Sequence, residues 1–475
     1  MASKNVSLST IPSGIRSPGQ YIEYNTTLAL RSLPTNDQSL LIVGQRTTAG
    51  TVPALVPTDI YSSDESALYF GAGSLIDIAV RAAIKANPYI SIAAIAVDDA
   101  AAGQAAHATV TFAGTSTVDG AFALYVGLQR IDVAVSVGDT AADVAAAMVT
   151  AIVQTPSLHV TAAAEDAVLT ITAKNKGVTG NGIQLSQLNQ AAGVTAVIVA
   201  MAGGLNDPDP EPALDAVFAS RYTLVASCWS QLDALTKIRS FADRISGAME
   251  MRPCVAVAGV VGTISESATL ASSINSGRIT FGWYPNSVSH VAEVAAGYAA
   301  VIGSEPDPAR PFNTLPIDGL DVVPVDKQAS RNEKEKALHE GLTPLEVGPD
   351  NNSVQIKRAI STYLVNPQGV NDPSMLDITT IRSLDYSRKA WRERFALRFS
   401  RSKLAPRIPA QVRSEMLDVA YKLEDLEILQ DIDTWKNSFI FEKDGQSIGQ
   451  LNGKLPAPVV PGLHVFAAEI DLILS

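Results

Sequence analysis

The sequence predicts an α/β core, with a mostly parallel sheet and helices on both faces, that is split by an α+β insertion domain. An α+β C-terminal domain follows, and extended N- and C-terminal arms flank the whole. Three observations predict this fold. Short apolar stretches alternate with helical patterns in two regions of the chain, as in parallel sheets buried on both faces. A segment rich in Ala, Thr and Val interrupts the alternation, and both chain ends carry the alternating pattern of an exposed strand.

The core is predicted from apolar strands and the helices between them. The expected strands are 40–45, 91–97, 222–227, 254–261 and 278–284, and the expected helices are 74–87, 231–249, 266–274 and 291–302. Pro88 marks the end of the first helix. Because the alternation of strand and helix breaks near Asp98 and resumes after residues 206–212, one discontinuous domain is expected.

The intervening segment is predicted to be a compact α+β surface domain. Its expected strands are 107–114, 121–127, 130–138 and 168–174. A helix over 140–154 is expected to open with a capping pair of Thr140 and Asp143. KGVTGNG, at 176–182, is interpreted as a turn-rich loop.

The C-terminal region of the chain has a different character. We expect a strand over 353–365, an Arg-rich helix over 387–400 with Trp391, Phe395 and Phe399 facing inward, an amphipathic helix over 412–429, and a strand over 463–475. The predicted organisation is therefore an N-terminal arm, a first core segment, the insertion, a second core segment and the C-terminal domain, with the limits 1–30, 31–102, 103–206, 207–345 and 346–475.

Bulk composition excludes several classes of protein. The chain has 475 residues, 47% of them apolar, which is long enough for several domains of about 100 to 200 residues each. No apolar run approaches the roughly 20 residues of a membrane span, and the N-terminus lacks an apolar signal region, so folding in a cytoplasm is expected. The net charge of −12 argues against a general nucleic-acid binder. Cys228 and Cys254 are interpreted as buried packing thiols.

A search for chemistry at the strand ends finds no convergent set of catalytic residues. The loop at 44–50 lacks the spacing and lysine of a phosphate-binding loop, and GAGSLI at 71–76 supplies only two glycines of GxGxxG. The five histidines are scattered singly. Asp98 and Asp99 could hold a cation or act as acid and base, but their place at the entry to the insertion favours a loop role. We therefore expect no enzyme activity and no cofactor.

The two chain ends and one charged region favour contacts with other chains. An unprotected terminal strand is a template for β-augmentation between subunits, and head-to-tail exchange of arms produces filaments. The alternative is that both ends pair within their own subunit. Residues 382–413 hold ten Lys or Arg, whereas 415–433 hold seven acidic residues. This asymmetry suggests contact with other subunits, or two solvated helix faces side by side.

Three segments resemble phage Mu-like contractile tail sheath proteins. They are PSGIRSPGQYIEY near the N-terminus, the run LLIVGQRTTAGTVPALVPTDIYSSDESALYFGAGSLI at 40–76, and the C-terminal VPGLHVFAAEIDLIL. GDTAADVAAAMV and LTITAKNKGVTGNG in the insertion are similar to the module that such sheaths carry. The resemblance covers nearly the whole chain.

The resemblance implies a structural virion protein that assembles in the host cytoplasm. It implies stacked hexameric rings in a helical sheath around a tail tube protein, with baseplate and tail terminator proteins as further partners. The extended sheath would be metastable, and contraction would drive the tube through the host envelope using energy stored at assembly. An outward-facing insertion, a tube-facing C-terminal domain and arms that act as hinges belong to the same picture. Neither nucleic acid nor membrane insertion is implied.

Two sets of residues are predicted to make these contacts. Arm pairing or anchoring is assigned to Tyr21, Ile22, Glu23, Tyr24, His464, Phe466, Ile470 and Leu472. Tube contact is assigned to the acidic helix bearing Glu415, Asp418, Glu424 and Glu427. The rival hypotheses are a cytoplasmic α/β enzyme with an inserted cap domain and a non-contracting shell or adhesin-like assembly protein.

Overall fold

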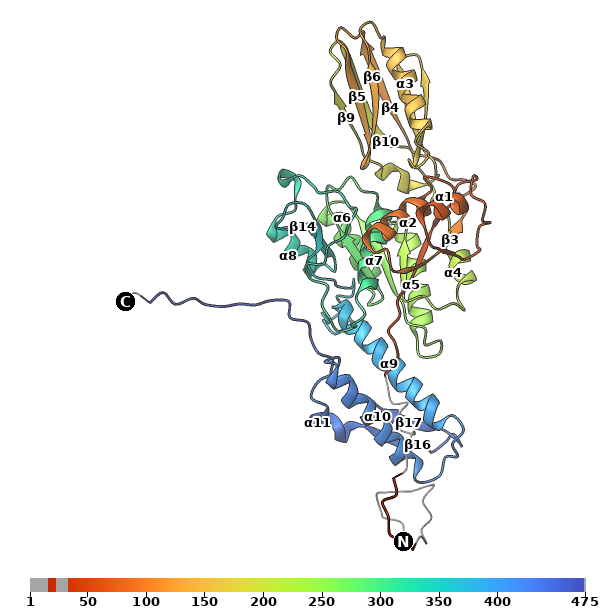
Figure 1. Cartoon of the computed structure of the whole chain (residues 1–475), viewed down its shortest axis with the longest axis vertical. Coiled ribbons are helices and arrows are strands. Elements are labelled where there is room, and N and C mark those ends of the chain that lie inside the picture. Colours follow the sequence, from red (N-terminus) through yellow and green to blue (C-terminus); the bar gives the residue numbers. More distant parts are fainter. Residues whose placement is uncertain (1–15, 23–32, 474–475) are drawn as a thin grey trace. The chain divides into compact units, whose positions relative to one another are not determined.

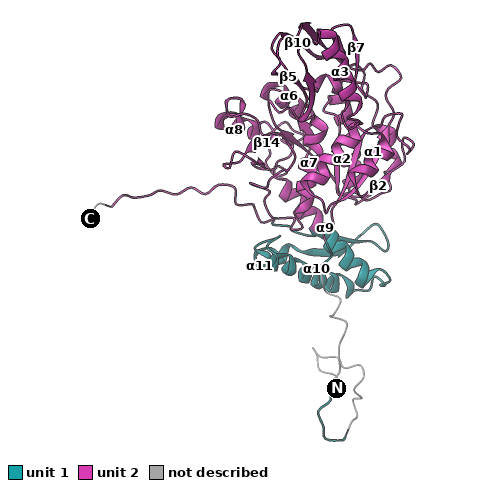
Figure 2. Cartoon of the chain, turned by 45° about the horizontal axis from the view of Figure 1, so that its top comes forward, with its two compact units in different colours: residues 1–35, 387–458 teal, residues 36–386, 459–475 magenta. Residues whose placement is uncertain are grey.

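The computed structural model describes residues 16–22 and 33–473, which form two compact units. Unit 1 comprises 1–35 and 387–458, and unit 2 comprises 36–386 and 459–475 (Figure 2). The chain therefore crosses between the units three times. None of the helices in the described residues is long and apolar enough to cross a membrane.

Unit 2 is built on an eight-stranded sheet in the order β15-β14-β13-β12-β11-β1-β3-β2. The central strands are parallel: β1 (Ser39–Gln45), β3 (Ser91–Val97), β11 (Leu224–Ser227), β12 (Val255–Val260), β13 (Ile279–Trp283) and β14 (Thr343–Val347). Antiparallel strands lie at the two edges, β2 (Thr58–Ile60) and β15 (Val354–Ile356). The mostly parallel core sheet predicted from the sequence is confirmed.

Helices cover both faces of this sheet. Leu40 and Ile42 of β1 belong to one apolar cluster and Leu41 and Val43 to another, as the alternation of side chains along a strand requires. The first cluster includes α1 (Ser63–Phe70), α2 (Leu75–Ala86) and α7 (Val291–Ser304), of which α2 and α7 run side by side (Figure 1). The second cluster includes α4 (Glu211–Ala216), α5 (Leu232–Ser246), α6 (Ile264–Ile274) and α8 (Arg331–His339).

The segment between β3 and α4 forms two further sheets around a core of its own. One has the order β10-β4-β8-β7 and the other β6-β5-β9. Their strands are β4 (His107–Gly114), β5 (Gly120–Val126), β6 (Gln129–Val135), β7 (Val160–Glu165), β8 (Val168–Ala173), β9 (Leu185–Asn189) and β10 (Val194–Ala202). Both sheets pack with α3 (Ala141–Val153) in a third apolar cluster. The predicted capping box is present, because Thr140 and Asp143 each accept the other's backbone N–H.

Three strands and a 3₁₀ helix of this segment were not predicted. The strands β7, β9 and β10 had no counterpart in the sequence interpretation. The predicted loop at 176–182 contains a 3₁₀ helix, Val178–Gly182.

In unit 1, the helix α10 (Ile408–Asp425) packs with the second half of α9 (Ile378–Phe399), which begins in unit 2. The Trp391 indole N–H donates to the Met416 carbonyl (3.2 Å) and its ring meets Phe439 edge to face. A short helix α11 (Ile432–Trp435) and a hairpin of β16 (Ile440–Lys443) and β17 (Leu451–Lys454) complete the unit.

Several expectations for the C-terminal region of the chain are corrected. The helix expected over 387–400 begins nine residues earlier, and Phe395, expected to face inward, is 42% exposed. The strand expected over 353–365 is limited to Val354–Ile356, because the chain then turns into an irregular segment. Within the described chain, 463–473 form no strand, since an extended segment needs a partner to complete its hydrogen bonds.

Candidate functional site

Ligands in open α/β sheets bind at the carboxyl edge where the strand order reverses, and in this chain that point lies between β1 and β11. The helix α2 after β1 covers one face of the sheet and α5 after β11 covers the other. This edge is therefore the place to look for a small-molecule site.

The chain fills this position with its own side chains. Gln45 ends β1 and is fully buried. Its Nε2 donates to Asp99 Oδ1 and to the Lys176 carbonyl, both at 2.7 Å, and its Oε1 accepts from Trp229 Nε1 at 3.0 Å. Both hydrogens and the oxygen of the amide are thus used within the chain.

The side chain of Asn175 caps the N-terminus of the neighbouring helix α2. Its Oδ1 accepts the backbone N–H of Leu75, the first residue of α2, at 3.1 Å. Its Nδ2 donates to the Arg46 carbonyl (2.9 Å) and to Asp99 Oδ1 (3.1 Å). A helix N-terminus at a strand end is a favourable anion site, but here one of its N–H groups is satisfied by a side chain from the inserted segment.

The acidic pair at the end of β3 has the loop role favoured by the sequence. Asp99 belongs to the network of Gln45 and Asn175, and Asp98 accepts from Arg46 Nε at 2.7 Å. Among the described residues, no group of three His, Cys, Asp or Glu is arranged to hold a metal ion. Sequence reasoning missed this contact between core and insertion, because its partners lie 76 to 131 residues apart.

Both cysteines are buried packing thiols, as predicted. Burial raises the pKa of the Cys254 thiol to about 12, and it raises the pKa of Cys228 as well. Neither side chain therefore supplies a thiolate at neutral pH.

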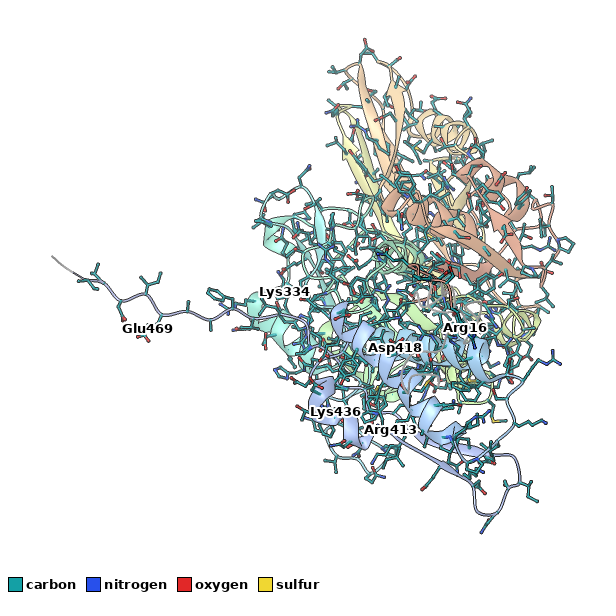
Figure 3. The ribbon with its side chains drawn as sticks, turned by 60° about the horizontal axis from the view of Figure 1, so that its bottom comes forward. Arg16, Lys334, Arg413, Asp418, Lys436 and Glu469 are labelled. Carbon is teal, nitrogen blue, oxygen red and sulfur yellow. The ribbon has the colours of Figure 1, made fainter. Side chains whose placement is uncertain are left out.

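The C-terminal segment 459–473 is extended and largely exposed. Figure 3 labels Glu469 on it. Apolar side chains on this segment are 78–94% exposed: Leu463, Val465, Phe466, Ile470, Leu472 and Ile473. His464, in contrast, has a side chain only 13% exposed that lies against Asn313 and Asp377. The sequence predicts arm pairing alike for His464, Phe466, Ile470 and Leu472. In the structure His464 packs against its own subunit, whereas the other three are exposed.

At the N-terminal end, Tyr21 and Ile22 are exposed, and the Tyr21 hydroxyl donates to the Ser17 carbonyl (3.2 Å). Residues 16–22 contain no helix or strand. Glu23 and Tyr24 lie outside the described residues.

The acidic helix predicted to contact the tube is α10, and two of its carboxylates pair within unit 1. Arg394 of α9 has a side chain only 4% exposed, and its Nη1 lies 3.1 Å from Glu415 Oε2 and 2.7 Å from Asp418 Oδ2. Arg398 lies 3.8 Å from Glu415, and Lys422 lies 3.2 Å from Asp418, which Figure 3 labels. These complementary charges, noted in the sequence, thus pair inside one unit.

The other two predicted tube residues lie at the end of α10. Glu424 Oε1 accepts the backbone N–H of Ile432 at 2.9 Å and so links α10 to α11. Glu427 is exposed and has a left-handed backbone (φ 56°) just after the helix. Of the four acidic residues, Glu427 is the one that the structure leaves most accessible to a partner.

The hairpin β16–β17 is the remaining feature suited to an assembly contact. Its two strands pair from Ile440 with Lys454 to Lys443 with Leu451, and in the described chain no third strand joins either edge. A two-stranded sheet is marginally stable alone and offers unpaired N–H and C=O groups on both sides.

Comparison with known proteins identifies the family. Residues 203–362 match the family model of the phage tail sheath protein central domain, and 370–473 match that of the phage tail sheath C-terminal domain. A Mu-like prophage FluMu tail sheath protein from Haemophilus influenzae is 27% identical over 488 residues, covering 99% of this chain and 100% of the relative.

Solved structures of similar fold include two chains from contractile assemblies. A chain from the baseplate of the anti-feeding prophage has a TM-score of 0.51 at 10% identity, covering 97% of this chain and 100% of that one. A chain from the contracted PVC sheath complex of an extracellular contractile injection system has a TM-score of 0.50 at 11% identity, covering 98% and 99%. At these identities the likeness concerns the fold alone.

The two family models together match more than half of the chain, and the curated relative spans nearly all of it. The resemblance noted in the sequence is confirmed. The chain belongs to the phage tail sheath family and is a structural subunit of a contractile sheath.

Proposed function

We propose that this subunit polymerises around a tail tube as stacked six-fold rings and contracts to drive the tube through the host cell envelope. Neighbouring subunits would be connected by exchanged arms, and the energy would be stored at assembly. Baseplate and tail terminator proteins would close the two ends of the sheath, and assembly would take place in the host cytoplasm before the virion is complete.

The observation that carries this proposal is the exposed apolar C-terminal segment. If this extended segment pairs as a strand, Phe466, Ile470 and Leu472 share one face, whereas Glu469 and Asp471 lie on the other. Fully burying one such large apolar side chain contributes about 1.5 to 3 kcal/mol. A neighbouring subunit that accepted this face could therefore gain several kcal/mol.

We propose the hairpin β16–β17 as the acceptor. Its edge groups need partners, and an added strand would supply main-chain hydrogen bonds while the apolar face of the arm supplies burial. The N-terminal arm, with Tyr21, Ile22, Glu23 and Tyr24, would add in the same way. Since each subunit both donates and accepts, the contact is head-to-tail and propagates.

The remaining assignments follow from the family picture. The insertion at 103–206 would be a surface domain between the core segments 31–102 and 207–345, and the region 346–475 would face the tube. Tube contact is proposed for α10, through Glu424 and Glu427 more than through Glu415 and Asp418, because Arg394 already neutralises the latter pair.

The test compares the two faces of the C-terminal arm. A triple variant with Phe466→Asp, Ile470→Asp and Leu472→Asp should remain a folded subunit that no longer forms sheaths, because the substituted side chains are exposed in the subunit but buried in the polymer. The matched control, Glu469→Ala with Asp471→Ala, should assemble normally. Electron microscopy of the purified chains provides the measurement. Long striated cylinders from the triple variant would contradict the arm contact, and so would normal sheaths from a chain lacking residues 1–27.

A further inference from the structure

The three places where the chain crosses between the units share a structural feature. The crossings lie at 35/36, 386/387 and 458/459. On the unit 2 side of each crossing, one residue contacts the same loop, residues 305–313, which we call the joint loop. These residues are Asn36, Arg382 and His464.

Asn36 is the first residue of unit 2 and fixes the first crossing. Its Nδ2 donates to the carbonyl of Pro306 in the joint loop at 2.7 Å. Its own backbone carbonyl and side-chain oxygen accept from Gln38 Nε2 at 3.0 and 2.9 Å. Asn36 is thus hydrogen-bonded both to the joint loop and to Gln38, just before β1 begins.

Arg382, in the first half of α9, fixes the second crossing. Its side chain is buried, its Nη2 donates to the Glu305 carbonyl at 2.6 Å, and its guanidinium lies over the ring of Phe312 at 5.2 Å from the centroid. Burial lowers the pKa of this guanidinium to about 10, so the group is still charged at neutral pH. A buried charge contacting both ends of one loop restrains α9 against that loop.

The C-terminal arm is fixed at its root in two ways. His464 Nδ1 lies 3.0 Å from Asn313 Nδ2, and Nε2 lies 3.6 Å from Oδ1 of Asp377, the residue just before α9. Gly462 passes so close to the joint loop that a Cβ added there would lie 2.7 Å from Pro311 Cγ. Beyond His464, every residue from 465 to 473 is exposed.

The joint loop is firmly attached to the core of unit 2. It begins at the end of α7, and both α7 and the buried Phe312 belong to one apolar cluster of unit 2. Pro306, Pro308 and Pro311 restrict its backbone. Just after the loop, the N–H of Thr314 donates to the Ile356 carbonyl of β15 at 2.8 Å.

The backbone at Thr314 supports the same conclusion. Its φ of 63° is unusual for a β-branched residue. Such a conformation costs on the order of 1 to 3 kcal/mol and persists only where the surroundings impose it. The loop is thus a stiff element and not a flexible connection.

We propose that the joint loop is a common anchor for all three crossings, so that the N-terminal arm, the helix α9 and the C-terminal arm pivot from one rigid place on unit 2. Unit 1 and both arms would then all move relative to the same fixed loop in the core of unit 2. This would keep the exit points of the arms at fixed mutual distances while the segments beyond them move. Its role in contraction rests on the proposed function, but the anchor itself does not.

Hydrogen–deuterium exchange of the unassembled full-length chain tests the anchor. We call the three segments that contain these contacts the roots: 36–39, 379–386 and 460–466. Replacing Pro306, Pro308 and Pro311 together by Gly should raise amide exchange about tenfold or more in all three roots and leave exchange in α5 unchanged. His464→Ala should raise exchange at 460–466 alone, and Phe466→Ala, just beyond the anchor, should change none of the roots. A rise confined to the loop, or to only one root, in the triple Gly variant would overturn the proposal.

A second variant covers the case in which the triple Gly chain does not fold. Gly462→Val places a side chain against Pro311, where an added Cβ would already lie 2.7 Å from Pro311 Cγ, and so displaces the joint loop itself, which His464→Ala does not. Exchange should then rise at 460–466 and, through the loop, at 379–386. An unchanged 379–386 segment would show that the crossings are independent. Because the chain is measured unassembled, a failure of sheath formation in the wild-type protein would refute the proposed function without changing this result.

Discussion

Asn175 allows a quantitative test of how the insertion is held to the core. Its side chain makes three hydrogen bonds across this boundary, to the Leu75 N–H, the Arg46 carbonyl and the Asp99 carboxylate. A typical intramolecular hydrogen bond contributes about 1 kcal/mol net, and a bond to a charged group somewhat more. The change Asn175→Ala should therefore destabilise this contact by about 3 kcal/mol.

The exchange rate of the Leu75 amide measures this loss directly. Its N–H is the first in α2, where no intrahelical acceptor exists, and Asn175 Oδ1 is the acceptor that the structure gives it. Since about 1.4 kcal/mol corresponds to a factor of ten, Asn175→Ala should accelerate exchange at Leu75 by about a hundredfold. Asn175→Asp keeps an acceptor for Leu75 but places a carboxylate about 3 Å from that of Asp99, so the amide should stay protected in a less stable chain.

Asn181 provides the matched control. Its side chain makes two hydrogen bonds, against three for Asn175, and both join the Gly204 backbone, at 3.0 and 2.8 Å. They lie at the exit of the insertion and do not involve α2. Asn181→Ala should lower the stability of the inserted segment and leave Leu75 protected. The reasoning fails if Asn175→Ala changes Leu75 exchange less than about threefold, or if Asn181→Ala accelerates it equally.

Three further changes have expected outcomes. Arg394→Met removes the buried cation between Glu415 and Asp418 and should lower the free energy of unfolding of unit 1 by about 2 kcal/mol, as measured by urea denaturation, with Arg394→Lys restoring only some of it. Burial lowers the pKa of His290 to about 4, below its unfolded value near 6.5, so the unfolded chain binds this proton first and stability falls as pH falls from about 6.5 to 4. His290→Asn keeps a helix N-cap and should reduce the slope of thermal stability against pH in that window, whereas an unchanged slope would contradict the assignment. Gly44→Ala would place a methyl group 2.6 Å from Cys228 Sγ inside the sheet and should lower the melting temperature through an overpacking cost of about 1 to 3 kcal/mol.

The sequence predicted the central strands well because burial on both faces leaves a continuous apolar run. In β1, Leu40 to Val43 divide between two clusters, so every position is apolar and the strand is unmistakable. The strand next to the edge strand β15 gave no such signal. β14 has the sequence TPLEV, with a proline and a glutamate, and its strand conformation depends on pairing with β13 and β15.

The Arg-rich helix shows the limit of hydropathy. The spacing of Trp391, Phe395 and Phe399 suggests an inward aromatic stripe, yet Ala390 and Arg394 take the buried positions. Arg394 can be buried only because two carboxylates of another helix neutralise it. That partnership depends on which helix packs against which, and periodicity carries no information about it.

The polar residues at the carboxyl edge of the sheet were equally hard to interpret. Lys176 was assigned to a turn-rich loop over 176–182 because its neighbours are typical of loops, and Asn175 was given no role. Their role becomes visible only when Gln45 and Asp99 are brought beside them by the fold. The absence of catalytic motifs was visible in the sequence, but the filling of the position by the chain itself was not.

The arms and the rigid units must contribute differently to contraction. A contact shifts an equilibrium between two states only by the difference of its free energy in those states. If the exchanged arms stay paired in both the extended and the contracted sheath, they stabilise both equally and cannot drive the change. Their apolar faces then determine whether subunits assemble, and the driving force must come from surfaces that meet only after the units move. Ile470→Val, which removes one methylene from the exposed apolar face, should therefore lower the yield of sheath while leaving the temperature of contraction unchanged. A shift in that temperature with unchanged yield would instead assign the driving force to the arms.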